Sequence, residues 1–265
     1  MTVGVADDDR GLLLGDGLFE TLLVDRGTPL ALDAHRERLA RGSMTLGLPA
    51  PGARPFMAAV RTAVAAAGLG EARAAVRVNW TAGAGGRGLD RPDSLSPRLW
   101  ASASPAPQNL PPARLITAQV RRNDGSPTSR LKTLAYLDNV LARAEARALG
   151  ADEALMLNSR GEIACAAAAN LFWIAQDQLF TPALECGVLD GTVRAVVLAL
   201  ASQLGVPARE VRAERAALEA AQAVFLTNSL IGLRPVSYLD GRALVVHPLV
   251  TKLSALWEAS LASSS

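Results

Sequence analysis

The chain has 265 residues, half of them hydrophobic, with 27 basic and 25 acidic side chains and a formal net charge of +2. This length allows one large domain or two small ones with a hydrophobic core. The charge balance and an aromatic content of 4% argue against nucleic-acid binding, which needs a basic stripe with stacking aromatic side chains.

The remaining composition narrows the class of protein further. No stretch reaches the roughly 18 uninterrupted apolar residues of a membrane-spanning helix. The N-terminal residues MTVGVADDDRG lack the basic region and apolar core of a secretory signal. Two cysteines and two histidines indicate neither a disulfide framework nor a metal site. We therefore expect a soluble protein of the reducing cytoplasm that binds neither membrane nor metal.

The first hundred residues predict strands and helices in a small α/β domain. Residues 11–24, GLLLGDGLFETLLV, are typical of two apolar strands joined by a tight Gly-Asp-Gly turn. A short strand then leads to Asp33, which is a candidate cap for a helix carrying residues 35–38. Residues 55–68 have helical spacing with a glycine stop, and residues 76–80 alternate as a half-buried strand does.

The next segment, residues 83–110, is rich in Gly, Pro, Ser and Ala and predicts no regular structure. We place the domain boundary near Pro105 to Pro112, which gives a small N-terminal domain of residues 1–107 and a larger C-terminal domain of residues 108–265.

The C-terminal domain predicts strands in clusters divided by helices. The strands are residues 113–120, 154–157, 163 onward, 170–174, 179–181 and 224–226; the helices are residues 134–149, 192–204, 213–221 and 248–261. This order favours an α+β fold in two lobes.

The segment Gly83-Ala84-Gly85-Gly86-Arg87-Gly88 matches the dinucleotide-binding pattern G-x-G-x-x-G. That pattern also needs a helix that begins in the loop, so that its N-terminus meets a pyrophosphate. A proline-rich segment follows instead. A nicotinamide-binding protein is therefore a distant alternative, and a flexible loop near a pocket is the better interpretation.

Lys132 is the residue with the greatest chemical interest. It lies in SPTSRLKTLAYLDN, where a strand end meets the start of the predicted helix, and apolar residues flank it. Burial lowers the proton affinity of a lysine and frees its amine for Schiff-base chemistry. A surface lysine is the alternative, and composition and pattern leave both open.

Six segments in register carry a resemblance to a known family. They are residues 9–11 with 15–21 (DRG, GDGLFET), 35–39 (HRERL), 126–143 (SPTSRLKTLAYLDNVLAR), 169–172 (ANLF), 189–194 (LDGTVR) and 227–229 (TNS). Together they resemble the class IV aminotransferase family, the group that holds aminodeoxychorismate lyase, D-amino-acid transaminase and branched-chain aminotransferase. The resemblance implies the two-lobed α+β architecture of fold-type IV pyridoxal-phosphate enzymes, with the cofactor in the cleft between the lobes.

The resemblance also implies roles for individual residues. Lys132 would hold pyridoxal 5'-phosphate as a Schiff base and move the proton at the substrate α-carbon. Arg38 would bind the cofactor phosphate, although a helix-surface arginine is the alternative. Further contacts with the cofactor would come from the backbone N–H groups of Thr192 and Val193, the Ser229 hydroxyl, Leu189 beneath the ring and the Tyr136 hydroxyl. A core aromatic role for Tyr136 is nearly as well supported.

Two positions depart from the family pattern. Cys165 stands five residues before the Asn of the N-L-F motif, where the family has a glutamate that pairs with the pyridine nitrogen. Since a thiol hydrogen-bonds only weakly, we hypothesise that the ring nitrogen is less protonated here and the electron sink weaker. Ala82 stands where many relatives have an arginine that helps to bind the substrate carboxylate, and Arg87 is a candidate replacement.

Two reactions within the family remain open. A lyase of the aminodeoxychorismate type eliminates pyruvate and leaves 4-aminobenzoate, on the way to folate. A transaminase moves the amino group of a branched-chain or D-amino acid to a 2-oxo acid. The short chain, the lysine segment and the NLFW sequence at residues 170–173 favour the lyase, while a non-catalytic cofactor-binding relative is a further alternative. The resemblance implies a small amino-acid-like substrate and a homodimer in which a loop of the partner completes each site.

Overall fold

The computed structural model describes residues 5–262. The described chain forms two compact units. The N-terminal unit consists of residues 5–107 and 131–135, and the C-terminal unit consists of residues 108–130 and 136–262. Residues 1–4, at the start of the segment considered above for a secretory signal, lie outside the described residues.

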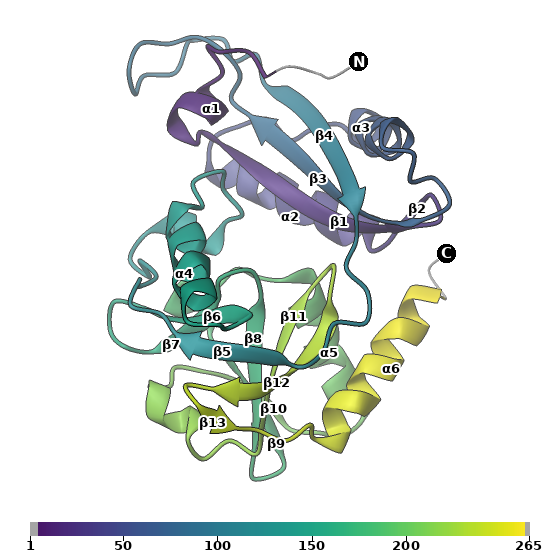
Figure 1. Ribbon diagram of the computed structural model, residues 1–265. Helices are drawn as coiled ribbons and strands as arrows, with labels where there is room; N and C mark the ends of the chain where they lie inside the picture. Colours follow the sequence, from purple (N-terminus) through teal and green to yellow (C-terminus); the bar gives the residue numbers. More distant parts are fainter. Residues whose placement is uncertain (1–4, 263–265) are drawn as a thin grey trace. The chain divides into compact units, whose positions relative to one another are not determined.

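The N-terminal unit is a sheet covered by helices on one face (Figure 1). Its antiparallel sheet has the strand order β2-β1-β3-β4. The elements are α1 (Arg10–Leu14), β1 (Gly17–Asp25), β2 (Thr28–Pro29), α2 (Leu32–Thr45), α3 (Ala53–Ala66), β3 (Arg73–Thr81) and β4 (Arg98–Pro105).

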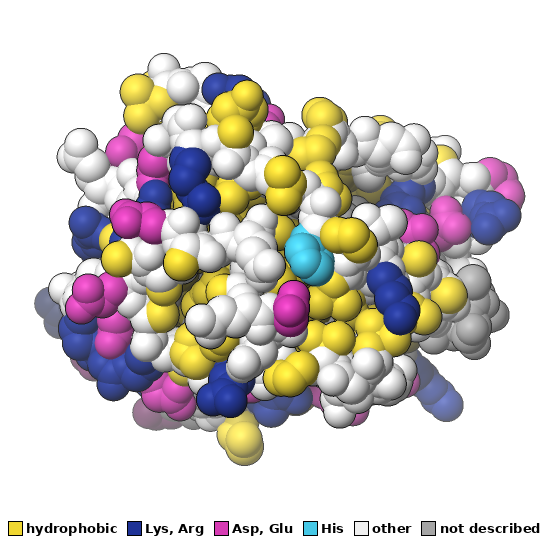
Figure 2. All heavy atoms as spheres, turned by 90° about the horizontal axis from the view of Figure 1, so that it is seen from below, with side chains coloured by type: hydrophobic (Ala, Val, Ile, Leu, Met, Phe, Trp, Pro, Cys, Tyr) yellow, Lys and Arg dark blue, Asp and Glu magenta, His cyan; other side chains and the backbone are white. Residues whose placement is uncertain are grey.

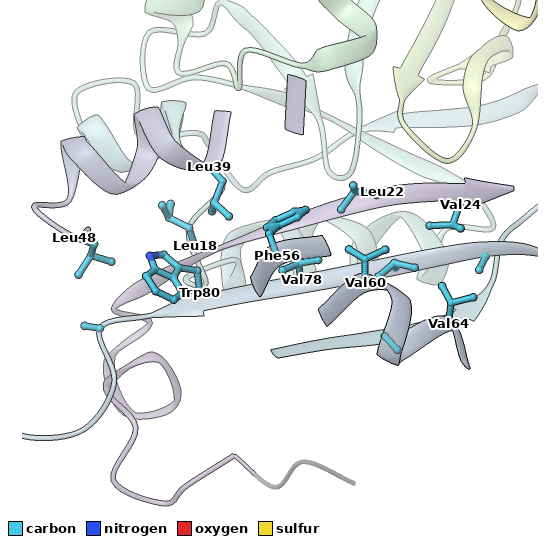
Figure 3. Close-up of a cluster of buried hydrophobic side chains, with 14 residues drawn as sticks. Leu18, Leu22, Val24, Leu39, Leu48, Phe56, Val60, Val64, Val78 and Trp80 are labelled. Carbon is cyan, nitrogen blue, oxygen red and sulfur yellow. The ribbon is translucent and has the colours of Figure 1, made fainter. Parts of the chain in front are cut away.

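Alternation along β1 and β3 decides which side chains enter the core of this unit. Leu18, Leu22 and Val78 point to the helix-covered face, where they meet Leu39 of α2 and Phe56 of α3 (Figure 3). The residues between them in sequence point to the opposite face, because successive strand side chains alternate. Phe19, Arg77 and Asn79 therefore share the face that the two helices leave uncovered.

The start of the chain differs from the prediction of two strands. Residues Arg10–Leu14 form the short helix α1, because the Asp9 carboxylate accepts a hydrogen bond from the Gly11 N–H at 2.8 Å and caps it. Leu12 and Leu13 are consequently exposed rather than buried in a strand. Asp33 does not cap α2; the helix begins at Leu32, and Asp33 pairs with Arg36 in its first turn.

The segment predicted to be irregular contains a strand. β4 pairs with β3 over eight residues, and its weakly apolar sequence RLWASASP gave little periodic signal. No helix begins in the glycine loop before it, so the dinucleotide-binding pattern lacks the helix it requires.

The C-terminal unit is built on a larger mixed sheet, with the strand order β10-β9-β8-β11-β12-β5-β6-β7 and β13 paired to β12. Three clusters of buried hydrophobic side chains surround it. Its strands are β5 (Ala113–Thr117), β6 (Glu153–Leu157), β7 (Ile163–Ala166), β8 (Asn170–Ala175), β9 (Gln178–Pro182), β10 (Ala208–Val211), β11 (Ala223–Asn228), β12 (Gly232–Leu239) and β13 (Arg242–Ala243). Its α-helices are α4 (Leu137–Ala148), α5 (Thr192–Gln203) and α6 (Pro248–Ala262).

Most elements of this unit match the predicted ranges; the exceptions are one predicted helix and some strands that were not predicted. The helix expected over residues 213–221 is only a 3₁₀ turn, Arg215–Leu218, whose Leu218 side chain is buried in the core. The strands β10 and β12 were not predicted, because their arginine, serine and proline residues interrupt the apolar pattern. The α+β class itself is confirmed.

The lysine segment was expected within the C-terminal domain, yet residues 131–135 pack with the N-terminal unit. The Phe19 N–H donates to the Lys132 carbonyl at 2.8 Å, and the Leu134 N–H donates to the Gly17 carbonyl at 3.0 Å. The segment thus extends the β1 edge, which places Lys132 next to Phe19.

On the face drawn in Figure 2, basic, acidic and apolar side chains are interspersed, and no broad area of one charge is visible there. Among the described helices, none combines the length and apolar character required to cross a membrane.

Candidate functional site

The Lys132 amine lies among aromatic and charged side chains of the N-terminal unit. Its Nζ is 4.2 Å from the centroid of the Phe19 ring. The Arg77 guanidinium lies over the same ring, 3.6 Å from the centroid, and donates from Nε to Asn79 Oδ1 at 2.9 Å. Phe19 of β1 and Arg77 of β3 are therefore among the side chains that surround the amine.

This environment lowers the pKa of Lys132 from 10.5 to about 7. Burial is the largest cause, the positive charges of Arg38 and Arg77 act in the same direction, and the Glu20 carboxylate opposes them. The side chain keeps some accessible surface, but the protein atoms packed around the nitrogen decide its hydration. A substantial fraction of the amine is therefore neutral, and nucleophilic, near neutral pH.

Arg38 is held by a buried carboxylate on the neighbouring strand. Its Nε donates to Glu20 Oε1 at 2.8 Å and its Nη2 donates to Glu20 Oε2 at 2.6 Å. His35, one helical turn earlier on α2, has its Nδ1 2.8 Å from Glu20 Oε2. Glu20 and His35 are each 1% exposed, and the Arg38 side chain is 10% exposed.

The charges around Glu20 keep it ionised. Burial alone would raise its pKa, but Arg38 and His35 outweigh burial, and the pKa falls from 4.5 to about 2. The structure thus places Arg38 inside the unit rather than on the surface of its helix. Its positive charge contributes to the lowered pKa of Lys132, so two residues expected at the cofactor belong to the same unit and act on one another electrostatically.

The C-terminal unit brings together Thr192 and Ser229. Thr192 Oγ1 and Ser229 Oγ are 3.2 Å apart, although 37 residues separate them in sequence. Thr192 is the first residue of α5, and the residue before it, Gly191, supplies no side chain to cap the helix. The backbone N–H groups of the first turn, including that of the buried Val193, are typical of an anion-binding helix N-terminus.

Close packing before α5 requires a glycine at position 191. Asn170 Nδ2 donates to the Leu189 carbonyl at 2.9 Å. A Cβ on Gly191 would lie 1.9 Å from Asn170 Oδ1, so only glycine fits. Asn228 stabilises the turn that contains Ser229, because its Oδ1 accepts from the Leu230 and Ile231 N–H groups at 2.9 and 3.0 Å. The turn that carries Ser229 is therefore set by Asn228.

Cys165 lies on β7, opposite Met156 of β6, and is 6% exposed. Burial raises the pKa of its thiol; the nearby Arg122 opposes this rise, and Glu153 adds to it. The thiol is therefore neutral at physiological pH and cannot replace the carboxylate that the family pattern has at this position.

The two remaining expected residues have fewer described contacts. Tyr136 precedes α4, where its carbonyl accepts from the Val140 N–H at 3.1 Å. Arg87 is exposed in the glycine loop. That loop is not simply flexible, because the buried Arg10 guanidinium donates to the carbonyls of Gly85, Gly88, Leu89 and Asp90.

Several residues near the expected site were not assigned a role from the sequence. Glu20 and His35 stand inside the matched segments GDGLFET and HRERL, so the motifs pointed to their positions but not to their contact with Arg38. Arg77 had only its place on a half-buried strand as a signal. Asn170 and Asn228 are likewise motif residues whose contacts become visible only in the structure.

Known proteins are similar to this chain over most of its length. The family model "Amino-transferase class IV" matches residues 17–239. The chain is 31% identical to a putative branched-chain-amino-acid aminotransferase of Methanocaldococcus jannaschii, over 89% of this chain and 83% of that protein. It is 29% identical to the aminodeoxychorismate lyase of Bacillus subtilis, over 88% and 80% of the two chains.

A solved structure is similar along nearly the whole chain. The crystal structure of 4-amino-4-deoxychorismate lyase from Pseudomonas aeruginosa superposes with a TM-score of 0.85 and 35% identity, covering 98% of this chain and 97% of that one. The match to the family model spans most of the sequence and includes Lys132, Arg38 and Ser229. The chain therefore belongs to the class IV aminotransferase family of pyridoxal-phosphate-dependent enzymes.

Proposed function

We propose that the chain catalyses a lyase reaction of the aminodeoxychorismate type, releasing pyruvate and leaving 4-aminobenzoate. The observation that carries the chemistry is the Lys132 amine, whose pKa of about 7 suits a group that must bind a carbonyl carbon and move protons at neutral pH. The choice of a lyase is supported by the 35% identity to a 4-amino-4-deoxychorismate lyase over almost the full length of both chains.

The residues on each unit have the chemistry that pyridoxal phosphate needs. Lys132 supplies the amine for its aldehyde, and Arg38 supplies a permanent positive charge for its phosphate. Thr192 and Ser229 offer two hydroxyls 3.2 Å apart, beside the N–H groups of the first turn of α5. We propose these four residues, with Val193, Leu189 and Tyr136, as the cofactor-binding set, and the exposed Arg87 as a candidate for the substrate carboxylate.

When bound, the cofactor supplies an electron sink for the bond cleaved at the substrate α-carbon. The protein supplies the proton transfers. Because the pKa of Lys132 lies close to neutral pH, its amine can accept a proton from the substrate and return it without a large energetic penalty in either direction.

The proposed reaction is tested by incubating the purified enzyme, loaded with pyridoxal phosphate, with aminodeoxychorismate and no added 2-oxo acid. We expect one pyruvate to be released for each 4-aminobenzoate formed, because elimination needs no amino acceptor. Pyruvate is measured with a coupled dehydrogenase and 4-aminobenzoate by its fluorescence.

The alternatives give different results in the same assay. A transaminase of branched-chain or D-amino acids would release no pyruvate under these conditions, and would convert an added 2-oxo acid only when an amino donor is present. A non-catalytic relative would bind the cofactor at Lys132 and turn over neither mixture. Either result would replace the lyase proposal.

We also propose that the enzyme is a homodimer. Leu137, Val140 and Leu141 of α4 are 68%, 58% and 49% exposed, and their i, i+3, i+4 spacing forms one apolar stripe on the helix. Light scattering should give a particle mass near twice 27.6 kDa. Replacing Val140 and Leu141 with glutamate should yield a monomer, and a wild-type monomer would contradict the proposal.

A further inference from the structure

Glu20 is a charged residue in the apolar interior of the N-terminal unit. It lies on β1 between Leu18 and Leu22, which face the same helix-covered side and are buried. At 1% exposure, its carboxylate has been removed from water almost completely. Burial of a charge is energetically unfavourable, and replacing a buried ion pair by well-packed hydrophobic residues often leaves a protein equally or more stable.

The contacts of Glu20 indicate a role for this buried charge. Arg38 binds the two carboxylate oxygens through Nε and Nη2, at 2.8 and 2.6 Å. Two parallel hydrogen bonds of this kind fix the plane of a guanidinium as well as its position. His35 Nδ1, 2.8 Å from Oε2, holds the carboxylate from the same helix face, since residues three apart on a helix are neighbours.

The strand that carries Glu20 also contacts the lysine segment. Glu20 follows Phe19, whose N–H donates to the Lys132 carbonyl at 2.8 Å. The charged groups acting on the amine are Arg38 from α2, Arg77 from β3 and Glu20 from β1. Two of them are positive and disfavour the protonated amine, while Glu20 favours it.

We propose that Glu20, held by His35, is a positioning residue that fixes the Arg38 guanidinium for the cofactor phosphate and offsets the positive charge around the Lys132 amine. The role of Glu20 in fixing Arg38, here called the phosphate half of the proposal, rests on the proposed cofactor-binding set. Its effect on the charge around Lys132, the charge half, concerns the protein without cofactor and does not depend on that set.

The charge half is tested on the cofactor-free protein by labelling lysines with acetic anhydride across pH and quantifying each peptide by mass spectrometry. The chain has two lysines, and the exposed Lys252 serves as an internal reference. Glu20→Gln should move the Lys132 labelling midpoint to lower pH by about one unit, as expected for loss of a neighbouring opposite charge. Glu20→Asp, which keeps the charge, should leave the midpoint near that of the wild type.

A matched control is available in the same unit. The Asp16 carboxylate also bridges two arginines, accepting from Arg10 Nε at 2.9 Å and from Arg91 Nη2 at 2.5 Å. Asp16→Asn should leave the Lys132 midpoint unchanged. A folded Glu20→Gln protein with a wild-type midpoint would overturn the charge half.

The phosphate half is tested by comparing the affinities for pyridoxal phosphate and for pyridoxal, which lacks the phosphate. In both Glu20→Gln and Glu20→Asp, the preference for the phosphate form should fall by about tenfold or more, since a charge-assisted bidentate contact is misplaced. Asp16→Asn should keep the wild-type preference. An unchanged preference in both Glu20 variants would overturn this half.

Failure of the proposed cofactor-binding set and failure of the Glu20 proposal give different results. If the wild-type protein shows no preference for the phosphate form, the proposed cofactor set is wrong, and the labelling experiment still decides the charge half. If Glu20→Gln does not fold, as its circular dichroism would reveal, Glu20→Asp decides the phosphate half and Glu20→Leu, which removes the charge with an apolar side chain, decides the charge half. A folded Glu20→Leu protein with a wild-type Lys132 midpoint would then overturn the charge half.

Discussion

Replacing Lys132 with alanine should abolish covalent attachment of pyridoxal phosphate and lower turnover by about 10²–10⁴-fold or more, the contribution typical of a positioned proton-transfer group. The physical reason is that this amine both binds the cofactor and moves the substrate proton. Borohydride reduction followed by peptide mapping should label Lys132 in the wild-type protein and leave the variant unlabelled.

The matched control is Lys252→Ala, which removes the other lysine of the chain from the exposed surface of α6. It should keep full labelling at Lys132 and full turnover. A Lys132→Ala enzyme with wild-type turnover, or a wild-type protein that is labelled elsewhere, would discard the assignment of the catalytic lysine.

Lys132 should also make the free energy of unfolding of the cofactor-free protein depend on pH. Its pKa is about 7 in the folded state, against 10.5 for the ordinary amine. Between these pH values the unfolded chain binds more protons, so the Lys132 contribution to stability rises with pH from about 7 to 10.5. Chemical denaturation of wild type and Lys132→Ala across this range should show the difference in slope.

Replacing Cys165 with glutamate should strengthen the electron sink of the bound cofactor. A carboxylate within about 4–6 Å of the pyridine nitrogen raises the pKa of that nitrogen by about 1–3 units, so its protonated fraction increases by about tenfold or more. We expect a changed visible spectrum of the bound cofactor and a higher turnover number, both measured on enzyme reconstituted to the same occupancy.

The control for this change is Cys165→Gln, which has nearly the same shape without the charge and should give neither effect. The glutamate also has a cost. Burial and the nearby Glu153 disfavour a second carboxylate, whereas Arg122 favours it, so the melting temperature without cofactor is expected to fall. If spectrum and turnover are the same in wild type and Cys165→Glu, the hypothesis of a weakened sink is wrong.

The sequence predicted the secondary structure correctly where the local apolar pattern agrees with the packing. The hairpin of β6 and β7, the helix α5 and the strand β3 were expected at nearly their observed ranges, because alternating or helical apolar spacing reflects burial on one face. The prediction was wrong at residues 11–14, where three leucines read as a strand but Asp9 caps a short exposed helix. A cap of one residue outweighed the apolar pattern there.

By itself the sequence determined the family and the α+β class and singled out Lys132 as the candidate catalytic residue, because these depend on short motifs and on their order along the chain. Only the tertiary structure decided that residues 131–135 pair with β1 and that Glu20 holds Arg38. The physical reason is that both depend on contacts between residues far apart in sequence, Gly17 with Leu134 and Glu20 with Arg38. Motif spacing does not encode such distances, and the pKa of Lys132 follows from them.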